Sequence, residues 1–508
     1  MTGIVADGSL VGVIGAGTMG AGIAQVALVA GHRVALHDKV DGAAGRAVAG
    51  LVARLDSLAR KGRLAVEDAE ATKARLTVAD DLGAFEGAVL IIEAIVENLA
   101  VKQGLFTALE DVVSEDCLLA TNTSSLSVTA IAAGLKGPGR LVGMHFFNPA
   151  PLLPLVEVVS GLATDPAAAD RVAAYAEAWG KTTVRCASTP GFIVNRVARP
   201  FYSEALRAYE EGAADFATID AVLKQSAGFK MGPFELMDMI GLDVNLAVST
   251  SVWEATGHDP RYTPAWTQKE HVAAGRTGRK SGQGFYDYAE GAEKPEPRNA
   301  DETDAAPASA PTSALRMASL IGSPTTPAGP DRCGLVLPSG TRLARCEGRT
   351  ATSYGDGRIL VDLALDYHAA ETWALAPAVD TPPAALAEAV ALVQALGKKV
   401  LVVKDLPGMI ATRTVARIVN EAVDALARLD AGADDIDLAM RLGVNYPRGP
   451  IEWGANLGMS WVLSVLTNLD DTYRDGRYRA SVLLRTLAGE VAERPGQRKD
   501  GTRGTTSD

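Results

Sequence analysis

The sequence predicts an α/β domain with a doubly wound, mostly parallel sheet, followed by two tandem α-helical domains. Three observations lead to this fold class. Short apolar segments alternate with helical segments through the first 188 residues, the pattern turns helical beyond them, and one helical stretch occurs twice. The length of 508 residues fits such a division, because single hydrophobic cores rarely grow beyond about 250 to 300 residues.

Short apolar segments are the predicted strands of the first domain. They lie at residues 10–14, 34–37, 89–95, 118–121, 141–146, 155–159 and 182–186. Helices are expected over residues 21–30 and 167–179, where apolar side chains recur at helical spacing. Because strands and helices alternate, neighbouring strands are expected to run parallel in a Rossmann-type sheet. A separate helical domain is expected to begin near Pro190.

An internal repeat organises the rest of the chain. Residues 189–235 align with residues 406–452 without a gap, so that Asp220 meets Asp437. Residues 291–313 are rich in Pro, Ala and acidic residues, which is typical of a linker. The predicted divisions are a Rossmann domain at 1–188, a helical domain at 189–290, the linker at 291–313, a small degenerate α/β module at 314–405, the second helical domain at 406–490 and a flexible tail at 491–508.

Composition and charge exclude several classes of protein. The net charge of −12 opposes binding to nucleic acid or to an anionic membrane, because both would repel an acidic surface. Residues 9–31 carry no charge, yet their glycines fit a strand, turn and helix better than a membrane span or signal sequence. The four cysteines show no metal-binding spacing, so we predict no metal site and expect reduced thiols in the cytoplasm.

A phosphate-binding turn follows the first predicted strand. In such a turn the first glycine bends tightly, the second lets the backbone approach a pyrophosphate, and the third packs helix on strand. The alternative is a glycine-rich structural turn. We predict cofactor binding by Gly15, Gly17, Thr18, Met19 and Gly20. Asp38 ends the next strand, where a carboxylate binds a ribose 2′-hydroxyl and repels a 2′-phosphate, so NAD is favoured over NADP. Lys39 would soften that repulsion, which leaves NADP open.

His145 is the histidine best placed for acid–base chemistry. Among the six histidines, only His145 is predicted at the carboxyl end of a strand, where open α/β sheets bind ligands. Histidine has an ordinary pKa of about 6.5, which suits transfer of a hydroxyl proton. Twelve residues later Glu157 interrupts an apolar strand, where a carboxylate needs a partner. Taken alone, the two residues could also be a core histidine and an edge-strand charge.

The motifs around this pair resemble those of the 3-hydroxyacyl-CoA dehydrogenase family, in particular its long bacterial members with a duplicated C-terminal domain. The resemblance covers nearly the whole chain. It is carried by GAGTMG at 15–20, EAIVEN at 93–98, NTSSL at 122–126, HFFNP at 145–149, TPGFIVNR at 189–196, MGPFE at 231–235 and GQGFY at 282–286.

This resemblance implies a site and a reaction. His145 would be the general base in oxidation and the acid in reduction, with Glu157 orienting its ring, while Ser124 and Asn195 would donate to the substrate oxygen. Further contacts to the cofactor would come from Glu97, Lys102, Asn148 and Lys280, and a contact to coenzyme A from Lys61. The implied reaction is the reversible, NAD-dependent conversion of a 3-hydroxyacyl-CoA to a 3-oxoacyl-CoA.

The second copy of the repeat lacks the catalytic residues. Asn195 aligns with Thr412, and His145 and Glu157 fall on Asp362 and Ala374. We therefore expect one active site per chain. Since family members with a single helical domain dimerise through it, the second copy is expected to pack on the first and imitate that dimer. A homodimer of whole chains also stays open.

Several alternatives remain open at the level of sequence. The cations at 54–63, which include Lys61, could form a solvated helix face. The substrate could be a free hydroxy acid, or the chain could bind NAD without catalysis. No residue identifies the acyl group, so hydroxybutyryl, longer and dicarboxylic adipyl-type groups of fatty-acid or aromatic-acid catabolism all fit.

Overall fold

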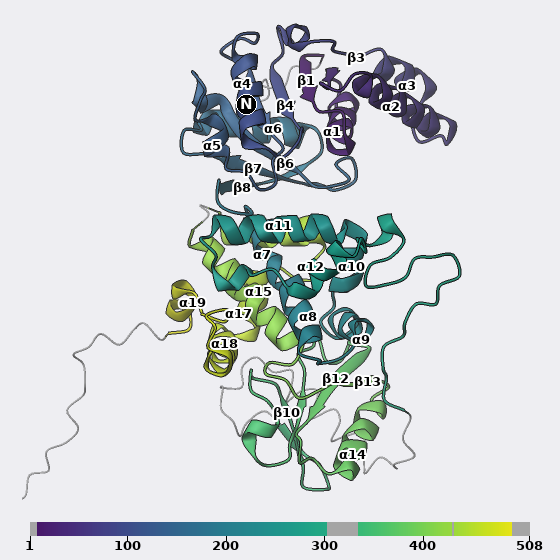
Figure 1. Ribbon diagram of the computed structural model, residues 1–508, viewed down its shortest axis with the longest axis vertical. Coiled ribbons are helices and arrows are strands. Elements are labelled where there is room, and N and C mark those ends of the chain that lie inside the picture. The colour runs from purple at the N-terminus through teal and green to yellow at the C-terminus, as the bar shows by residue number, and fades with distance from the viewer. Residues whose placement is uncertain (1–7, 302–333, 429–430, 490–508) are drawn as a thin grey trace, which may run out of the picture. The chain divides into compact units, whose positions relative to one another are not determined.

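The computed structural model describes residues 8–301, 334–428 and 431–489 (Figure 1). These residues form two compact units, each assembled from separate stretches of the chain. The first unit is made of the described parts of Met1–Ser203, Glu235–Glu293 and Ala425–Ile451, and the second of those of Glu204–Phe234, Lys294–Asp424 and Glu452–Asp508. Each unit therefore combines parts of both copies of the helical repeat.

The first unit contains an eight-stranded sheet in the order β3-β2-β1-β4-β5-β6-β7-β8. Its strands are β1 (Leu10–Ile14), β2 (Arg33–His37), β3 (Leu76–Val78), β4 (Leu90–Glu93), β5 (Leu118–Thr121), β6 (Leu141–Phe146), β7 (Leu155–Ser160) and β8 (Thr182–Ala187). Neighbours run parallel except for β6 and β7, which are antiparallel. The strand order reverses between β1 and β4, the point at which sheets of this kind bind ligands. The predicted doubly wound, mostly parallel sheet is confirmed.

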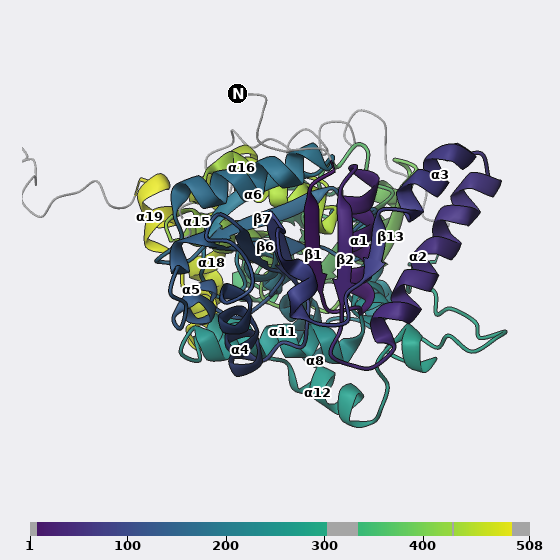
Figure 2. The same cartoon turned by 90° about the horizontal axis from the view of Figure 1, so that it is seen from above.

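Helices cover both faces of this sheet. The helices are α1 (Thr18–Val29), α2 (Ala43–Arg60), α3 (Val66–Lys73), α4 (Leu99–Glu110), α5 (Val128–Ala132) and α6 (Pro166–Ala178), with 3₁₀ turns η1 (Leu82–Phe85) and η2 (Pro138–Arg140). One core joins Ile23 of α1 and Val172 of α6 to Met144 of β6. The adjacent Gly143 faces the other side, where a Cβ would lie 3.1 Å from Val128 of α5. Figure 2 shows α5 and α6 on opposite sides of β6 and β7.

Among the predicted elements, two boundaries differ from the sequence prediction by two residues or more. Helix α1 begins at Thr18, inside the glycine turn, and not at Ala21. Strand β4 ends at Glu93 and not at residue 95, because the chain leaves the sheet at Ala94. The Ala94 carbonyl passes so close to Gly15 that a Cβ there would lie 2.3 Å from its oxygen.

Both helical copies share one helix pattern. The first copy contains α7 (Val194–Val197), α8 (Arg199–Glu210), α9 (Phe216–Ala221), the π-helical turn η3 (Val222–Ser226), α10 (Pro233–Ile240), α11 (Leu242–Ala255), η4 (Pro260–Tyr262), α12 (Trp266–Ala273) and η5 (Arg279–Ser281). The second contains α15 (Ala411–Leu426), α16 (Ala433–Val444), α17 (Pro450–Leu457), α18 (Met459–Tyr473) and α19 (Val482–Leu487). At equivalent turns, Phe192 and Met409 both adopt positive φ, 47° and 48°. The repeated sequence thus produces the repeated turn.

The second unit contains a five-stranded sheet in the order β13-β12-β11-β10-β9, with helix α14 (Pro383–Gln394) in its core. The strands are β9 (Gly334–Val336), β10 (Arg342–Arg345), β11 (Ile359–Val361), β12 (Thr372–Pro377) and β13 (Lys399–Val402), with a 3₁₀ turn η6 (Thr352–Tyr354). When the alignment of the two sequence copies is extended upstream, the residues of β12 align with those of β7, and the residues of β13 align with those of β8. Like β6 and β7, β11 and β12 are antiparallel. The duplication therefore includes the last strands of the first sheet.

The two helical copies exchange helices between the units. In the first unit, α16 of the second copy packs against α7 and strands β7 and β8. In the second unit, η3 of the first copy packs against β12, where the Ser226 hydroxyl donates to the Thr372 carbonyl at 2.6 Å. Each sheet is therefore covered by a segment from the other copy.

A buried ion cluster joins the two copies inside the second unit. The side chain of Arg413, on α15, is fully buried, and its Nε lies 2.9 Å from the Glu204 carboxylate of α8. Its Nη1 lies 2.8 Å from Glu211, and the Tyr478 hydroxyl donates to Glu204 at 2.8 Å. Buried charges of this kind require such partners, because an unpaired ion is strongly disfavoured in the interior.

Parts of the predicted linker and tail lie outside the described residues. Residues 291–301 of the linker are described, and there the Arg298 guanidinium pairs with Asp215 at 2.8 Å. Residues 302–313 of the linker, 314–333 of the predicted α/β module and the tail at 491–508 are not described. Across the described parts of the chain, no helix combines the length and the apolar character needed to cross a membrane.

Candidate active site

The glycine turn between β1 and α1 has the geometry of a cofactor cradle. Gly15 has φ of 104°, a conformation that favours glycine. A Cβ at Gly20 would lie 1.7 Å from the Gly15 carbonyl oxygen, so only glycine lets the helix approach the strand here. At Gly17, by contrast, a Cβ would have no atom within 4 Å among the described residues. The first and third glycines thus close the turn, and the second leaves room for a ligand.

Asp38 supports this turn directly. Its Oδ2 accepts the backbone N–H of Ala16 at 2.7 Å, and its Oδ1 accepts that of Val40 at 2.9 Å. The carboxylate therefore lies beside the glycine turn, at the end of β2, where a dinucleotide's ribose is bound in sheets of this type. Contact with the ribose 2′-hydroxyl stays a prediction.

His145 and Glu157 are opposite residues on neighbouring antiparallel strands, β6 and β7. The Nδ1 atom of His145 lies 2.6 Å from Oε2 of Glu157. The Glu157 side chain is fully buried, and its other oxygen accepts the backbone N–H groups of Ile193 and Val194 at 3.0 and 2.9 Å. Both oxygens of this carboxylate therefore have hydrogen-bond partners, and Glu157 holds both the imidazole ring and the start of α7.

The imidazole ring of His145 is clamped by aromatic side chains. Its centroid lies 4.6 Å from that of Phe147 and 5.8 Å from that of Phe192. The residue is 5% exposed. Because Nδ1 is engaged by Glu157, Nε2 is the nitrogen that can meet a substrate, which is the arrangement required of a general base.

Ser124 and Asn195 come together beside this pair. Ser124 follows β5, and Asn195 lies in α7, directly after the amides that Glu157 binds. The Asn195 Nδ2 donates to the Ser124 backbone carbonyl at 3.3 Å. Asn148 follows β6 in the same motif as His145. The predicted contacts of Ser124 and Asn195 with substrate, and of Asn148 with cofactor, stay predictions.

Asn122 was missed at the level of sequence, although it stands in the NTSSL motif. Its Oδ1 accepts the backbone N–H of Phe146 at 2.8 Å. The bond joins the ends of β5 and β6, which carry Ser124 and His145 respectively. The sequence signal that could have identified it is an asparagine placed directly after a buried strand.

Glu97 and Lys102 belong to a charge cluster in which Lys102 is buried and Glu97 is partly exposed. The side chain of Lys102 is 1% exposed, and its Nζ lies 2.6 Å from Glu93 and 3.1 Å from Glu97. Burial alone would raise the pKa of Glu97, but the charge of Lys102 and hydrogen bonds from Thr123, Ser125 and Lys102 outweigh it, so this pKa lies below its usual value. The predicted nicotinamide contacts of Glu97 and Lys102 stay predictions.

The two remaining predicted lysines lie on the surface. The Lys280 Nζ pairs with Asp243 at 2.6 Å, and its side chain is 49% exposed. Lys61 is exposed at the end of α2, near the exposed Arg60 and Arg63. This end of α2 therefore presents a group of cations that a phosphorylated ligand can reach.

Comparison with known proteins decides the family. The domain described as "3-hydroxyacyl-CoA dehydrogenase, NAD binding domain" matches residues 10–189. The domain described as "3-hydroxyacyl-CoA dehydrogenase, C-terminal domain" matches twice, at residues 191–288 and 408–500. The chain belongs to the 3-hydroxyacyl-CoA dehydrogenase family. Residues 343–407, between the two helical copies, match the "3-hydroxybutyryl-CoA dehydrogenase reduced Rossmann-fold domain".

Relatives of this dehydrogenase extend over most of its length. A 3-hydroxyadipyl-CoA dehydrogenase of Escherichia coli K12 is 45% identical over 480 residues, which cover 94% of this chain and 97% of that protein. A crystal structure of 3-hydroxybutyryl-CoA dehydrogenase from the same organism covers 95% of this chain and 98% of that one, with 44% identity and a TM-score of 0.86. The human mitochondrial hydroxyacyl-coenzyme A dehydrogenase is 40% identical over 282 residues, 54% of this chain and 90% of that protein. The chain is an oxidoreductase of this family, and its cofactor is NAD.

The structure corrects one step in the choice of His145. His37 is also the last residue of a strand, β2, so a strand-end position alone does not single out His145. The ring of His37 bonds the Ala79 carbonyl at 2.9 Å through Nδ1, whereas that of His145 meets a buried carboxylate. The buried carboxylate partner, and not the strand-end position, distinguishes His145 from His37.

In the second copy, Asp362 takes a different role. Its N–H donates to the Ala374 carbonyl, so the two residues stand opposite each other as His145 and Glu157 do. The Asp362 carboxylate accepts the backbone N–H groups of Ile410, Ala411 and Thr412 at 3.0, 2.7 and 2.8 Å. It anchors the start of α15 directly and has no histidine partner among its described contacts. The expected single active site per chain stays a prediction.

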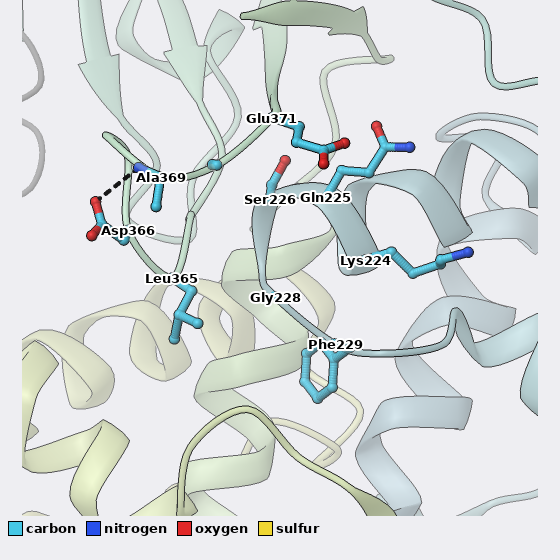
Figure 3. Close-up of a pocket in the computed structure, with 10 residues that line it drawn as sticks. Lys224, Gln225, Ser226, Gly228, Phe229, Leu365, Asp366, Ala369 and Glu371 are labelled. Atoms are coloured by element: carbon cyan, nitrogen blue, oxygen red, sulfur yellow. Dashed lines mark hydrogen bonds between the residues drawn. The ribbon is translucent and has the colours of Figure 1, made fainter.

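A cavity of about 430 Å³ lies in the second unit and contains none of the predicted site residues (Figure 3). It is lined by residues 224–226, 228 and 229 of the first copy and by residues 365, 366 and 369–371 between β11 and β12, among them Lys224, Phe229, Leu365 and Glu371. Several of its polar groups are used within the protein, since the N–H of Leu365 donates to Ser226 and that of Glu371 donates to Gln225. We assign no ligand to it.

Proposed function

We propose that this chain catalyses the reversible, NAD-dependent oxidation of (3S)-3-hydroxyacyl-CoA to 3-oxoacyl-CoA. The observation that carries the proposal is the buried pair of His145 and Glu157, with 2.6 Å between Nδ1 and Oε2. The glycine turn and Asp38 support a dinucleotide on the same sheet. The names of the relatives, which act on 3-hydroxyadipyl-CoA and 3-hydroxybutyryl-CoA, support an acyl-CoA substrate.

The mechanism follows from the protonation of His145. With its proton on Nδ1 and donated to Glu157, the ring accepts the substrate 3-hydroxyl proton at Nε2. Glu157 then stabilises the imidazolium, because the opposite charge is adjacent and buried. Ser124 and Asn195 donate to the substrate oxygen as it becomes a carbonyl. Bound NAD supplies the hydride acceptor for C3. In the reductive direction, His145 returns the proton.

Coenzyme A must meet a local basic surface on this acidic protein. The exposed cations at the end of α2, Arg60, Lys61 and Arg63, provide one. Binding of the nucleotide phosphates there would distinguish a thioester substrate from a free hydroxy acid. The acyl group itself is assigned only to the class of the relatives, from hydroxybutyryl to adipyl-type dicarboxylic groups, in fatty-acid or aromatic-acid catabolism.

The test of this function is a substrate panel. NADH formation is followed with 3-hydroxybutyryl-CoA, longer-chain and dicarboxylic 3-hydroxyacyl-CoA thioesters, and the corresponding free acids, with NADP in parallel. We expect turnover of thioesters with NAD and little with the free acids. Replacing His145→Gln should abolish turnover while NAD binding remains. Equal rates on free acids, or substantial activity of the variant, would contradict the proposal.

We also propose that the two helical copies form an internal pseudo-dimer. The exchange of α16 and η3 between the sheets and the buried contact of Arg413 with Glu204 support it. Sedimentation equilibrium tests the proposal, because an internal dimer removes the need for a second chain. A homodimer through the same helices would contradict it. Location in the cytoplasm, inferred from the cysteine pattern, stays a prediction.

A further inference from the structure

The charge cluster around Lys102 begins at the end of strand β4. Glu93, the last residue of β4, is fully buried. Its Oε1 accepts the backbone N–H of Ile95 at 2.8 Å and faces the Lys102 ammonium at 2.6 Å, and its Oε2 accepts the Thr121 hydroxyl at 2.7 Å. Since Thr121 belongs to β5 and Ile95 to the loop after β4, Glu93 is held by the sheet and this loop as well as by Lys102.

Lys102 connects this fixed carboxylate to a second one. It lies on α4, next to β4 in Figure 1, and its ammonium contacts both Glu93 and Glu97. A buried ammonium is tolerated only with such partners, and two carboxylates so near each other require a cation between them. Lys102 therefore determines where the Glu97 carboxylate lies.

Glu97 in turn holds the loop that follows β5. Its Oε1 accepts four donors, two from side chains and two from the backbone. These are the Thr123 hydroxyl at 2.6 Å, the Ser124 N–H at 3.0 Å, the Ser125 N–H at 3.1 Å and the Ser125 hydroxyl at 2.9 Å. On its other side, the Ser124 carbonyl accepts from Asn195. The Ser124 backbone is thus held from both directions.

We propose that Lys102, held by Glu93, is a positioning residue for the dehydrogenase reaction, which fixes Glu97 and through it the Ser124 loop. The proposal rests on the proposed function for the role of the Ser124 hydroxyl, but the loop contacts do not depend on that role. It differs from the expectation that Lys102 contacts NAD, because at 1% exposure the ammonium of Lys102 is enclosed by carboxylates.

The first test is hydrogen exchange of the Ser124 and Ser125 amides, which both donate to Glu97. We expect exchange at least about tenfold faster in Lys102→Met than in the wild-type chain, because Glu97 loses its cation and moves. Lys136→Met is the matched control, since it removes a lysine paired with Asp111 at 77% exposure. If the exchange of the two amides were unchanged in Lys102→Met, the proposal would be overturned whatever the activity.

A second variant tests whether misfolding accounts for the faster exchange. Lys102→Met leaves the buried Glu93 and the partly exposed Glu97 with no cation, whereas the double variant Glu93→Gln/Lys102→Met removes one charge of each sign. We expect the double variant to keep the melting temperature closer to that of the wild-type chain and still to show faster exchange at Ser124 and Ser125. Wild-type exchange rates in the double variant would overturn the proposal.

The third test uses kinetics with 3-hydroxybutyryl-CoA. We expect Lys102→Met to lower kcat by about ten- to a hundredfold while the Kd for NAD, measured by calorimetry, changes less than about twofold. In a Ser124→Ala background, the loss on adding Lys102→Met should shrink, because both changes affect one group. Full additivity, or a large rise in the Kd for NAD, would overturn the positioning role. If the wild-type chain showed no turnover, the proposed function would be refuted instead. The exchange experiment would still test the loop contacts.

Discussion

The substitution Glu157→Gln tests the proton chemistry most directly, because glutamine has nearly the shape of glutamate but no charge. Its amide oxygen can still accept the N–H groups of Ile193 and Val194, which lie 3.0 and 2.9 Å from the carboxylate. The amide nitrogen then faces Nδ1 of His145. The imidazole must accept there and carry its proton on Nε2, which is the wrong tautomer for a base.

The size of the effect follows from the charge that Glu157 provides. In the proposed mechanism, His145 becomes an imidazolium during oxidation, beside a carboxylate whose oxygen lies 2.6 Å from Nδ1. Opposite unit charges about 4 Å apart attract by about 4 kcal/mol at an effective dielectric constant of about 20. Because each 1.36 kcal/mol changes a rate about tenfold, we expect kcat to fall roughly a thousandfold.

The assay is the initial rate of NADH formation at saturating NAD and 3-hydroxybutyryl-CoA. Calorimetric binding of NAD and the melting temperature show whether the fold and the cofactor site persist. Glu177→Gln serves as the control, since it removes an exposed carboxylate of α6 that accepts only from Thr183 in the described contacts. A kcat of Glu157→Gln within about tenfold of the wild-type value would refute the assigned role.

Three other substitutions test the cofactor, the coenzyme A surface and the interior. Asp38→Ala should raise kcat/KM with NADP relative to NAD by at least about tenfold, because the carboxylate that repels a 2′-phosphate is gone; an unchanged ratio would contradict this. Lys61→Glu should raise KM for the acyl-CoA several-fold, less so at high salt, with kcat nearly unchanged; a salt-independent KM speaks against a phosphate contact. Arg413→Met should lower the free energy of unfolding in urea by about 3 to 5 kcal/mol, because the buried Glu204 loses its nearest cation and keeps only the more distant Arg417, at 3.4 Å. A change below about 1 kcal/mol would show that the cluster relaxes.

Most of the fold was predictable because it depends on local patterns. Strands β1, β5 and β6 begin and end at the predicted residues, since each is a short and mostly apolar run. The end of β4 was not predictable from its apolar run. Directly after β4, the Ala94 carbonyl lies against Gly15, a contact between chain segments far apart in sequence. Nor does a repeat in sequence reveal that its two copies exchange α16 and η3.

The candidate site also contains features that could be predicted from the sequence and features that could not. His145 and Glu157 could be paired from sequence, because a buried carboxylate and a histidine on neighbouring strands each need a partner. The cluster of Glu93 and Lys102 could not, because its members are separated by a loop and a helix turn and look like ordinary surface charges in sequence. Its detection requires the burial of Lys102 and the distances to both carboxylates.

The two copies of the repeat separate the structural role of the site carboxylate from its chemical role. In both, a buried carboxylate accepts the backbone N–H groups at the start of a helix, Glu157 for α7 and Asp362 for α15. In the second copy this carboxylate is that of Asp362, which aligns with His145, and it reaches the helix directly. In the first copy it extends from the opposite strand, so an imidazole fits against its second oxygen. Anchoring the helix therefore needs only the acceptor, whereas proton transfer needs the charge, which is why Glu157→Gln should separate the two.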